Sequence, residues 1–150
     1  MNIKTGKTEM VSKGESVTTY SFFVHPDSEK IIYESTHVVT KSCPYKPDYS
    51  KGYVWRLYPD YDHFLSDLKT KSSIPLTKSL GYDTEATVTF YRSKIIYTFM
   101  VSGDLVLWSM DLVGKNKKQV TNNRVENFVT YFFRVVIEQF FLLTYMIQKR

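Results

Sequence analysis

The last 27 residues, 124–150, constrain the fold more than any other stretch of this chain. On a helix of about 3.6 residues per turn, their polar side chains form one narrow seam and apolar side chains fill nearly all of the remaining surface. A surface helix needs an apolar stripe of about 100°, and this one is apolar over roughly twice that width. Asn123 and Glu126 have the spacing of a capping box, which predicts that the helix begins there.

The width of this apolar surface also predicts that more than one sheet is needed to cover the helix. One sheet can cover one side of a helix, and surplus apolar surface left in water promotes aggregation. We therefore expect the helix to be buried in an interface with a protein partner or with a second copy of the chain. The alternative is that the predicted short helix and loops of residues 59–84 cover the remaining apolar surface within one chain. The residues expected in that interface are Phe132, Phe133, Val136, Phe140, Phe141 and Leu143.

Strand patterns precede this helix. Residues 17–24 and 30–40 are rich in β-branched and aromatic side chains and flank a turn at His25-Pro26-Asp27-Ser28, which predicts a hairpin. Residues 85–91, 94–101 and 105–113 are separated by very short connections, which predict antiparallel neighbours. We identify no internal repeat.

A short helix is predicted between these two groups of strands. Asp60 is a suitable N-cap, and the apolar residues Tyr61, Phe64, Leu65 and Leu68 follow at helical spacing. The expected fold is α+β with two layers, in which this short helix and the long C-terminal helix pack on an antiparallel sheet of about five strands. Residues 1–16 are expected to form a polar tail or edge segment, and residues 17–150 a single domain.

The chain has few features that suggest catalysis. His63 and Asp67 would meet on the predicted short helix and could orient a general base, although a surface ion pair explains them equally well. Cys43 and His37 could form a thiolate–imidazole pair, but nothing in their spacing brings them together. No nucleotide-binding glycine motif and no metal-ligand spacing occurs. We therefore predict a protein that is not an enzyme and uses no cofactor or metal.

Residues 41–61 and the basic C-terminal quarter suggest an alternative. Residues 115–150 hold seven Lys and Arg against two Asp and Glu, which equals the whole net charge of +5. Cations interleaved with aromatic rings suit single-stranded nucleic acid, but the same composition suits a protein-contact loop or simple packing. The residues that would bind nucleic acid are Lys46, Tyr49, Lys51, Tyr53, Trp55, Arg56, Lys115, Lys117 and Lys118.

The sequence also predicts the cellular location of the protein and the kind of partner it binds. The chain has no apolar leader and only one cysteine, which favours the cytoplasm or nucleus. Arg134 and Glu138 recur along the polar seam of the C-terminal helix, so a packed helix is favoured over a membrane span. The Lys, Tyr, Phe and Asn content is compatible with an AT-rich viral or phage genome. The function predicted is a protein-interaction or assembly subunit, whose partner is another protein or a second copy of the chain bound through the C-terminal helix. The sequence does not identify a small-molecule ligand.

Overall fold

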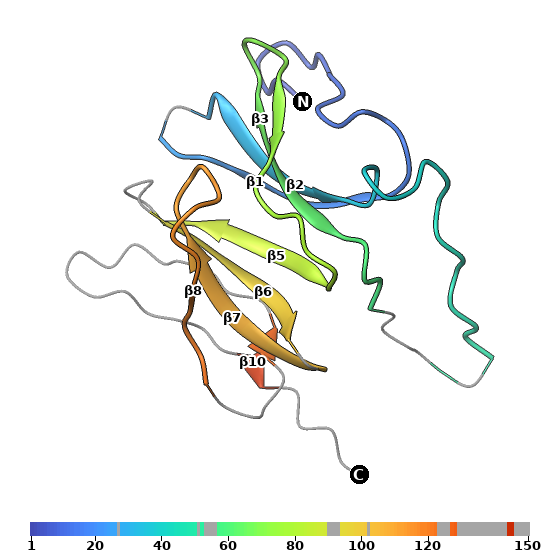
Figure 1. The fold of residues 1–150 in the computed structure, drawn as a ribbon. Coiled ribbons are helices and arrows are strands. Elements are labelled where there is room, and N and C mark those ends of the chain that lie inside the picture. The colour runs from blue at the N-terminus through green and yellow to red at the C-terminus, as the bar shows by residue number, and fades with distance from the viewer. Residues whose placement is uncertain are drawn as a thin grey trace.

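The described part of the chain is built from strands alone. A computed structural model describes residues 1–26, 28–50, 52, 57–89, 94–101, 103–122, 127–128 and 144–145. It contains two antiparallel sheets of four strands each, in which the strands follow chain order (Figure 1). The first sheet contains β1 (Thr18–Phe23), β2 (Lys30–Ser35), β3 (Asp62–Asp67) and β4 (Ser73–Pro75). The second contains β5 (Asp83–Val88), β6 (Ile95–Val101), β7 (Asp104–Met110) and β8 (Lys118–Gln119).

The predicted α+β fold is therefore wrong, and the short helix after Asp60 is the clearest error. The segment forms strand β3, which pairs with β2 and β4. Both faces of β3 are covered, since Phe64 packs on one face with Tyr33 and Leu65 packs on the other with Ile32. Apolar residues on both faces of a buried strand imitate helical spacing, so periodicity could not separate the two structures.

The long C-terminal helix is also contradicted where it can be tested. Of residues 124–150, the structure describes β9 (Asn127–Phe128) and β10 (Thr144–Tyr145), which pair as antiparallel strands. The six residues predicted for the partner interface, Phe132, Phe133, Val136, Phe140, Phe141 and Leu143, lie outside the described residues. The described part of the chain contains no helix long and apolar enough to span a membrane.

The predicted hairpin and meander are confirmed, and together they reveal a repeat that the sequence analysis missed. Lys-Ile-Ile-Tyr occurs at residues 30–33, at the start of β2, and again at residues 94–97, where β6 begins at Ile95. Tyr33 lies opposite Phe64 in the first sheet, and Tyr97 lies opposite Trp108 in the second. The two sheets are thus two copies of one unit, which we call unit 1 (β1–β4) and unit 2 (β5–β8).

The backbone repeats in finer detail as well. The first strand of each unit carries an irregularity in register, between Thr19 and Phe22 in β1 and between Thr84 and Thr87 in β5. Each irregularity contains a non-glycine residue with positive φ, 39° at Tyr20 and 59° at Glu85. Such bulges are specific local features that change the strand direction, so their recurrence supports a true structural duplication.

The last strand of each unit is also tied back in the same way. The Thr77 hydroxyl accepts the His63 amide at 2.9 Å, and the Thr121 hydroxyl accepts the Leu107 amide at 3.0 Å. The spacing between equivalent residues nevertheless differs along the chain, because residues 36–61 separate β2 from β3 whereas residues 102 and 103 separate β6 from β7. A repeat with a long insertion in one copy has no constant period, which hides it from a simple scan.

The two units pack face to face. The main core combines Ile32 and Leu65 of unit 1 with Ile95, Tyr97 and Met110 of unit 2. Strand β5 lies across unit 1, as Figure 1 shows, and all six of its residues are buried. We call the side of unit 1 that meets unit 2 its back face, and the side of unit 2 that meets unit 1 its front face.

Gly114 provides a test of this packing. Its φ is +76°, and a Cβ there would lie 2.5 Å from the Leu76 carbonyl oxygen in unit 1. Gly103 also has positive φ, +93°, but a Cβ there would meet nothing within 4 Å. We expect Gly114→Ala to lower the free energy of unfolding by about 1–3 kcal/mol more than Gly103→Ala, because only the former adds a clash with backbone. Equal losses in urea denaturation would contradict the close approach of the units at Gly114.

Candidate functional site

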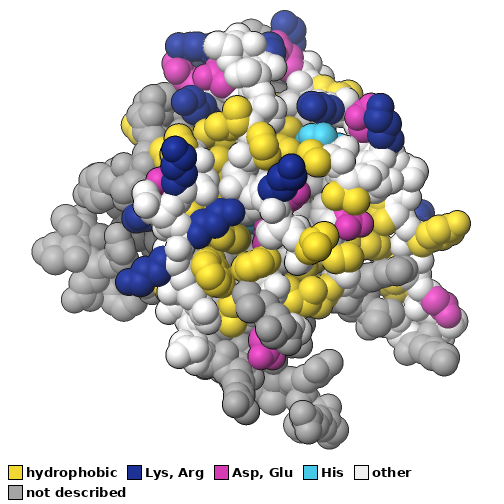
Figure 2. Space-filling view, viewed as in Figure 1, with side chains coloured by type: hydrophobic (Ala, Val, Ile, Leu, Met, Phe, Trp, Pro, Cys, Tyr) yellow, Lys and Arg dark blue, Asp and Glu magenta, His cyan; other side chains and the backbone are white. Residues whose placement is uncertain are grey.

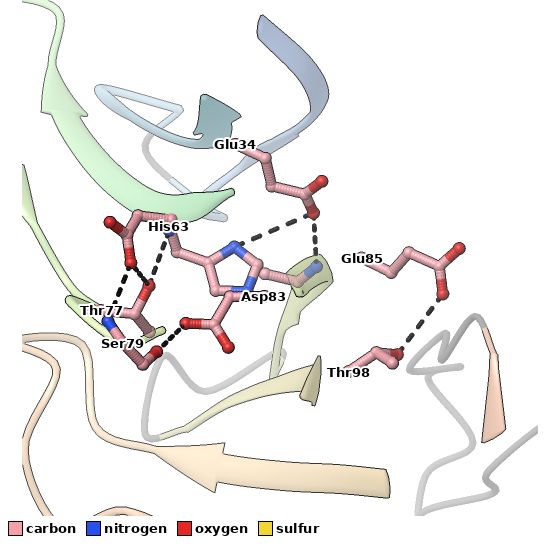
Figure 3. Close-up of polar contacts among 9 residues, drawn as sticks. Glu34, His63, Thr77, Ser79, Asp83, Glu85 and Thr98 are labelled. Atoms are coloured by element: carbon pink, nitrogen blue, oxygen red, sulfur yellow. Dashed lines mark hydrogen bonds and ion pairs between the residues drawn. The ribbon is translucent and has the colours of Figure 1, made fainter. Parts of the chain in front are cut away.

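A cluster of polar side chains lies between the two units and is the most unusual chemistry in the described residues. Glu34, His63 and Asp83 are each 0% exposed. Buried ionisable groups are rare because removing a charge from water is costly unless it is paired or neutralised. Figure 3 shows that the cluster draws on both units: β2 and β3 of unit 1, the connection after β4, and β5 of unit 2.

Glu34 connects unit 1 to the bulge of unit 2. The alternation of β2 places Glu34 on the same face as Ile32, toward β5. Its Oε1 atom accepts the backbone N–H of Ala86 at 3.2 Å, and the backbone of Glu85 also hydrogen-bonds to this carboxyl. The positive φ of Glu85 turns successive amides toward one point, which is a recurrent way of binding an acceptor. The carboxyl group of Glu34 therefore fastens the first strand of unit 2 to the back face of unit 1.

Glu34 and His63 face each other without forming an ion pair. They are directly opposite in the register of β2 and β3, and Glu34 Oε1 lies 3.8 Å from His63 Nδ1. Burial raises the pKa of Glu34 well above its usual range. Burial, with a smaller contribution from the positive charge of Lys117, lowers the pKa of His63 to about 3. His63 is consequently neutral at pH 7, and burial favours the neutral form of Glu34. The His63 ring packs edge-on against Tyr97 with 5.2 Å between centroids.

A second set of contacts ties the connection between the units to unit 1. Asp62 Oδ1 accepts the Thr77 hydroxyl at 3.0 Å and the Ser79 amide at 3.3 Å. The Ser79 hydroxyl in turn donates to Asp83 Oδ2, at the start of β5 (Figure 3). Burial raises the pKa of Asp83 to about 7, and the hydrogen bond from Ser79 partly opposes that shift.

Asp83 should make stability depend on pH. Its pKa of about 7 in the folded protein exceeds its usual 3.8, so between these values the folded protein retains a proton that the unfolded chain has lost. The stabilising contribution of Asp83 is therefore complete below about pH 4 and is lost as the pH rises to about 7. We expect the free energy of unfolding of the wild type to fall relative to that of Asp83→Asn over this range, measured in urea at several pH values.

The comparison with Asp83→Asn is needed because His63 acts in the opposite direction. Its lowered pKa makes the unfolded chain bind more protons between about pH 3 and 6.5, so its contribution to stability rises with pH there. His63 is present in both proteins, and its contribution cancels in their difference. A difference that stays constant from pH 4 to pH 7 would contradict the buried position of Asp83.

The enclosed arrangement favours a structural role for this cluster over catalysis. Its members include no Cys or Lys and leave no fully exposed group for a substrate to reach. Several of its buried atoms have no hydrogen-bond partner, among them Glu34 Oε2, both His63 ring nitrogens and Asp83 Oδ1. Within the described residues, no group of three or more His, Cys, Asp and Glu side chains could hold a metal ion.

The two predicted catalytic pairs do not form. His63 and Asp67 lie on strand β3, where four residues span about 13 Å. Asp67 instead accepts the amides of Lys69 and Thr70, each at 2.9 Å. Cys43 is exposed and its thiol lies 3.6 Å from the Ser16 carbonyl oxygen, whereas His37 packs on Phe64 with 4.3 Å between ring centroids.

The predicted nucleic-acid residues are not brought to one place. Lys46 and Tyr49 are exposed on the long loop of unit 1, and Lys51, Tyr53, Trp55 and Arg56 lie outside the described residues. Lys115, Lys117 and Lys118 are exposed at the β7–β8 connection, on the opposite side of the view in Figure 1. Figure 2 shows Lys and Arg side chains dispersed over this face among hydrophobic and acidic ones. Nucleic-acid binding stays a prediction.

Neither Glu34 nor Asp83 was predicted from the sequence as a site residue. The usable signal was the repeated Lys-Ile-Ile-Tyr, because it aligns the units and shows that Glu34 occupies the position of Thr98. A carboxyl group where the other copy has a hydroxyl marks a position at which the two units differ in chemistry.

Comparison with known proteins supports the fold and leaves the function open. No protein-family model matches the chain, and no curated protein does. Among solved structures, the chain resembles one described as a TolB from Agrobacterium tumefaciens, with a TM-score of 0.58 and 13% sequence identity. The similarity covers 81% of this chain and 36% of the other, so this chain spans about a third of that protein's length. At this identity the likeness concerns the fold alone.

Proposed function

We propose that this chain is a non-enzymatic protein-interaction or assembly subunit that works by stacking four-stranded sheets. The observation that supports this proposal is the unequal burial of two equivalent strands. All of β5 is buried against unit 1, whereas β1, its equivalent in unit 1, has four exposed and two half-buried residues. A repeat buries its apolar faces against its neighbours, so an uncovered first strand is a natural place for another sheet to bind.

Individual residues show how much surface β1 offers. Phe23 is 44% exposed, whereas its equivalent Val88 is 5% exposed. Tyr20 is 43% exposed, whereas its equivalent Glu85 is 5% exposed. Aromatic side chains supply much of the binding energy of protein interfaces, so two of them on an uncovered strand favour a protein partner.

The polar cluster supports the non-enzymatic part of the proposal. Its carboxyl and imidazole groups are enclosed and hold the units together, and the predicted catalytic pairs are separated. What remains at the surface is sheet, loop and dispersed charge, which suits binding better than chemistry.

Sedimentation equilibrium of the full-length chain over a range of concentrations tests this proposal. We expect the mean mass to rise reversibly with concentration, because a second copy is a partner of the right kind. Phe23→Glu should reduce this association by placing a charge on β1. Val39→Glu is the matched control, since Val39 is 59% exposed and lies outside the strands. A wild type that stays monomeric at every concentration would overturn the proposal of self-assembly.

A further inference from the structure

The N-terminal segment and unit 1 enclose a cavity between them. The cavity has a volume of about 350 Å³ and is lined by residues of segment 1–11, of β1, of β2 and of the β3–β4 turn. Figure 1 shows the N-terminal end of the chain beside β3. Small-molecule sites in proteins have volumes of about 300–1,000 Å³, so this cavity has room for one small ligand.

The floor of the cavity is apolar. Phe23 of β1 and Ile31 of β2 line it and are directly opposite in the register of the two strands. Leu68 and Val11 also line it, and both pack on the apolar cluster that contains Ile31. Phe23 is 44% exposed, whereas its equivalent Val88, which meets unit 1, is 5% exposed. An alkyl chain placed here would remove this apolar surface from water.

Two ammonium groups lie at the rim of the cavity. Lys7 and Lys71 both line it and both pair with the Glu9 carboxylate, Lys7 at 3.0 Å. The side chains of Lys7 and Lys71 are 73% and 60% exposed, so their charges remain in water. The hydrogen bonds from Lys71 and from Lys7 lower the pKa of Glu9 to about 2, and Glu9 is therefore ionised at pH 7. Two positive charges against one negative leave an excess of +1 at the rim, which favours an anionic group.

Hydrogen bonds shape the wall and the rim of the cavity. Asn2 Oδ1 accepts the Thr5 amide at 3.0 Å, and the Asn2 amide donates to the Lys7 carbonyl oxygen at 2.8 Å. On the other side, the Asp67 carboxylate accepts two amides of the turn that carries Lys71. A site whose backbone is already ordered loses less conformational entropy when a ligand binds.

We propose that this cavity binds a medium-chain carboxylate, with its alkyl chain on Phe23, Ile31 and Leu68 and its carboxylate between Lys7 and Lys71. An apolar floor with a cationic rim matches a ligand that is apolar along its length and anionic at one end. Glu9 competes with the ligand for the two ammonium groups and so sets its affinity. The inference goes beyond the proposed assembly, because every residue of the site belongs to one chain.

Titration of the full-length protein with octanoate tests the inference, followed by NMR of the methyl groups of Val11, Ile31 and Leu68. We expect saturable shifts of these signals. Hexanoate should bind about tenfold more weakly, because it removes two fewer methylene groups from water. Octanol lacks the charge and should also bind more weakly than octanoate. Octylammonium should bind most weakly of the eight-carbon probes, because its charge has the same sign as the excess at the rim.

Three variants test the charges at the rim. Glu9→Gln should raise the affinity for octanoate about threefold, because it frees both ammonium groups at an exposed site. Lys71→Met should lower it about threefold and reduce the preference for octanoate over octanol. Lys69→Met is the matched control, since it removes the same charge from the same turn but its side chain pairs with Glu29 and does not line the cavity. It should bind octanoate as the wild type does.

A fourth variant separates the floor from the rim. Leu68→Ser should weaken octanoate and octanol by the same factor, because it changes the apolar contact and leaves both ammonium groups in place. The preference for octanoate over octanol should therefore persist in Leu68→Ser and decline in Lys71→Met. Circular dichroism should show an unchanged strand content in every variant.

Each other outcome overturns the inference. Methyl signals that do not move, or shifts that spread over the surface without saturating, would show no site or adventitious binding only. Equal affinity for octanoate and octanol would contradict recognition of the carboxylate. Equal losses in Lys69→Met and Lys71→Met would show a general effect of charge, and weaker binding in Glu9→Gln would contradict competition by Glu9. The solution mass that tests the proposed function does not enter these measurements, so the two proposals can fail separately.

Discussion

Replacing Tyr97 with alanine is expected to lower the free energy of unfolding by about 3–5 kcal/mol. Tyr97 is 2% exposed and belongs to the core that the two units share. Its ring also meets the edge of the His63 ring, so its removal leaves a cavity beside buried polar atoms. Urea denaturation followed by circular dichroism measures the change.

Two comparisons make the Tyr97 result interpretable. Tyr97→Phe keeps the ring and should cost less than about 1.5 kcal/mol, because it nearly conserves volume. Tyr45→Ala removes a side chain that is 89% exposed and should change stability by less than about 0.5 kcal/mol. If Tyr97→Ala were as mild as Tyr45→Ala, the face-to-face packing of the two units would be wrong.

Glu34→Ala is expected to lower the free energy of unfolding by about 2–4 kcal/mol, because it leaves buried donors without an acceptor. The Ala86 amide, 3.2 Å from Glu34 Oε1, loses this acceptor. The hydrogen bond between the Glu85 backbone and the Glu34 carboxyl is lost as well. The alanine also leaves a cavity next to His63, which is fully buried. Both effects weaken the contact between the units.

Glu34→Gln separates the role of the acceptor from that of the charge. Burial raises the pKa of Glu34 and so favours its protonated form, whose carbonyl oxygen a neutral amide also provides. We expect Glu34→Gln to retain most of the stability that Glu34→Ala loses. If the two variants were equally destabilised at pH 7, the neutral acceptor role assigned to Glu34 would be contradicted.

The duplication has a consequence for how the chain binds. In a stack of repeats each unit needs a neighbour on both faces, and a terminal unit needs a cover with a polar outer side. Residues 1–16 have this character only in part, because Val11 packs on the cluster of Ile31 and Phe64 but Met1, Ile3 and Met10 are 80%, 94% and 74% exposed.

Strands were predicted correctly from composition where turns and short connections flank them. The hairpin of β1 and β2 and the meander of β5 to β7 were predicted because β-branched and aromatic runs flank tight connections. The segment of Phe64 and Leu65 was misread, since its apolar spacing fits a helix as well as a strand covered on both faces. Only the pairing of β3 with β2 and β4 distinguishes the two.

The sequence by itself determined the strands of the hairpin and of the meander and the turns between them, because these depend on residues close together in the chain. Tertiary structure decided that β5 crosses unit 1, and this placement brings Glu34 to the amides of Glu85 and Ala86. It also decided the ionisation of His63 and Asp83, whose shifted pKa values arise from burial between the units. Burial depends on residues distant in sequence, and no local pattern carries that information.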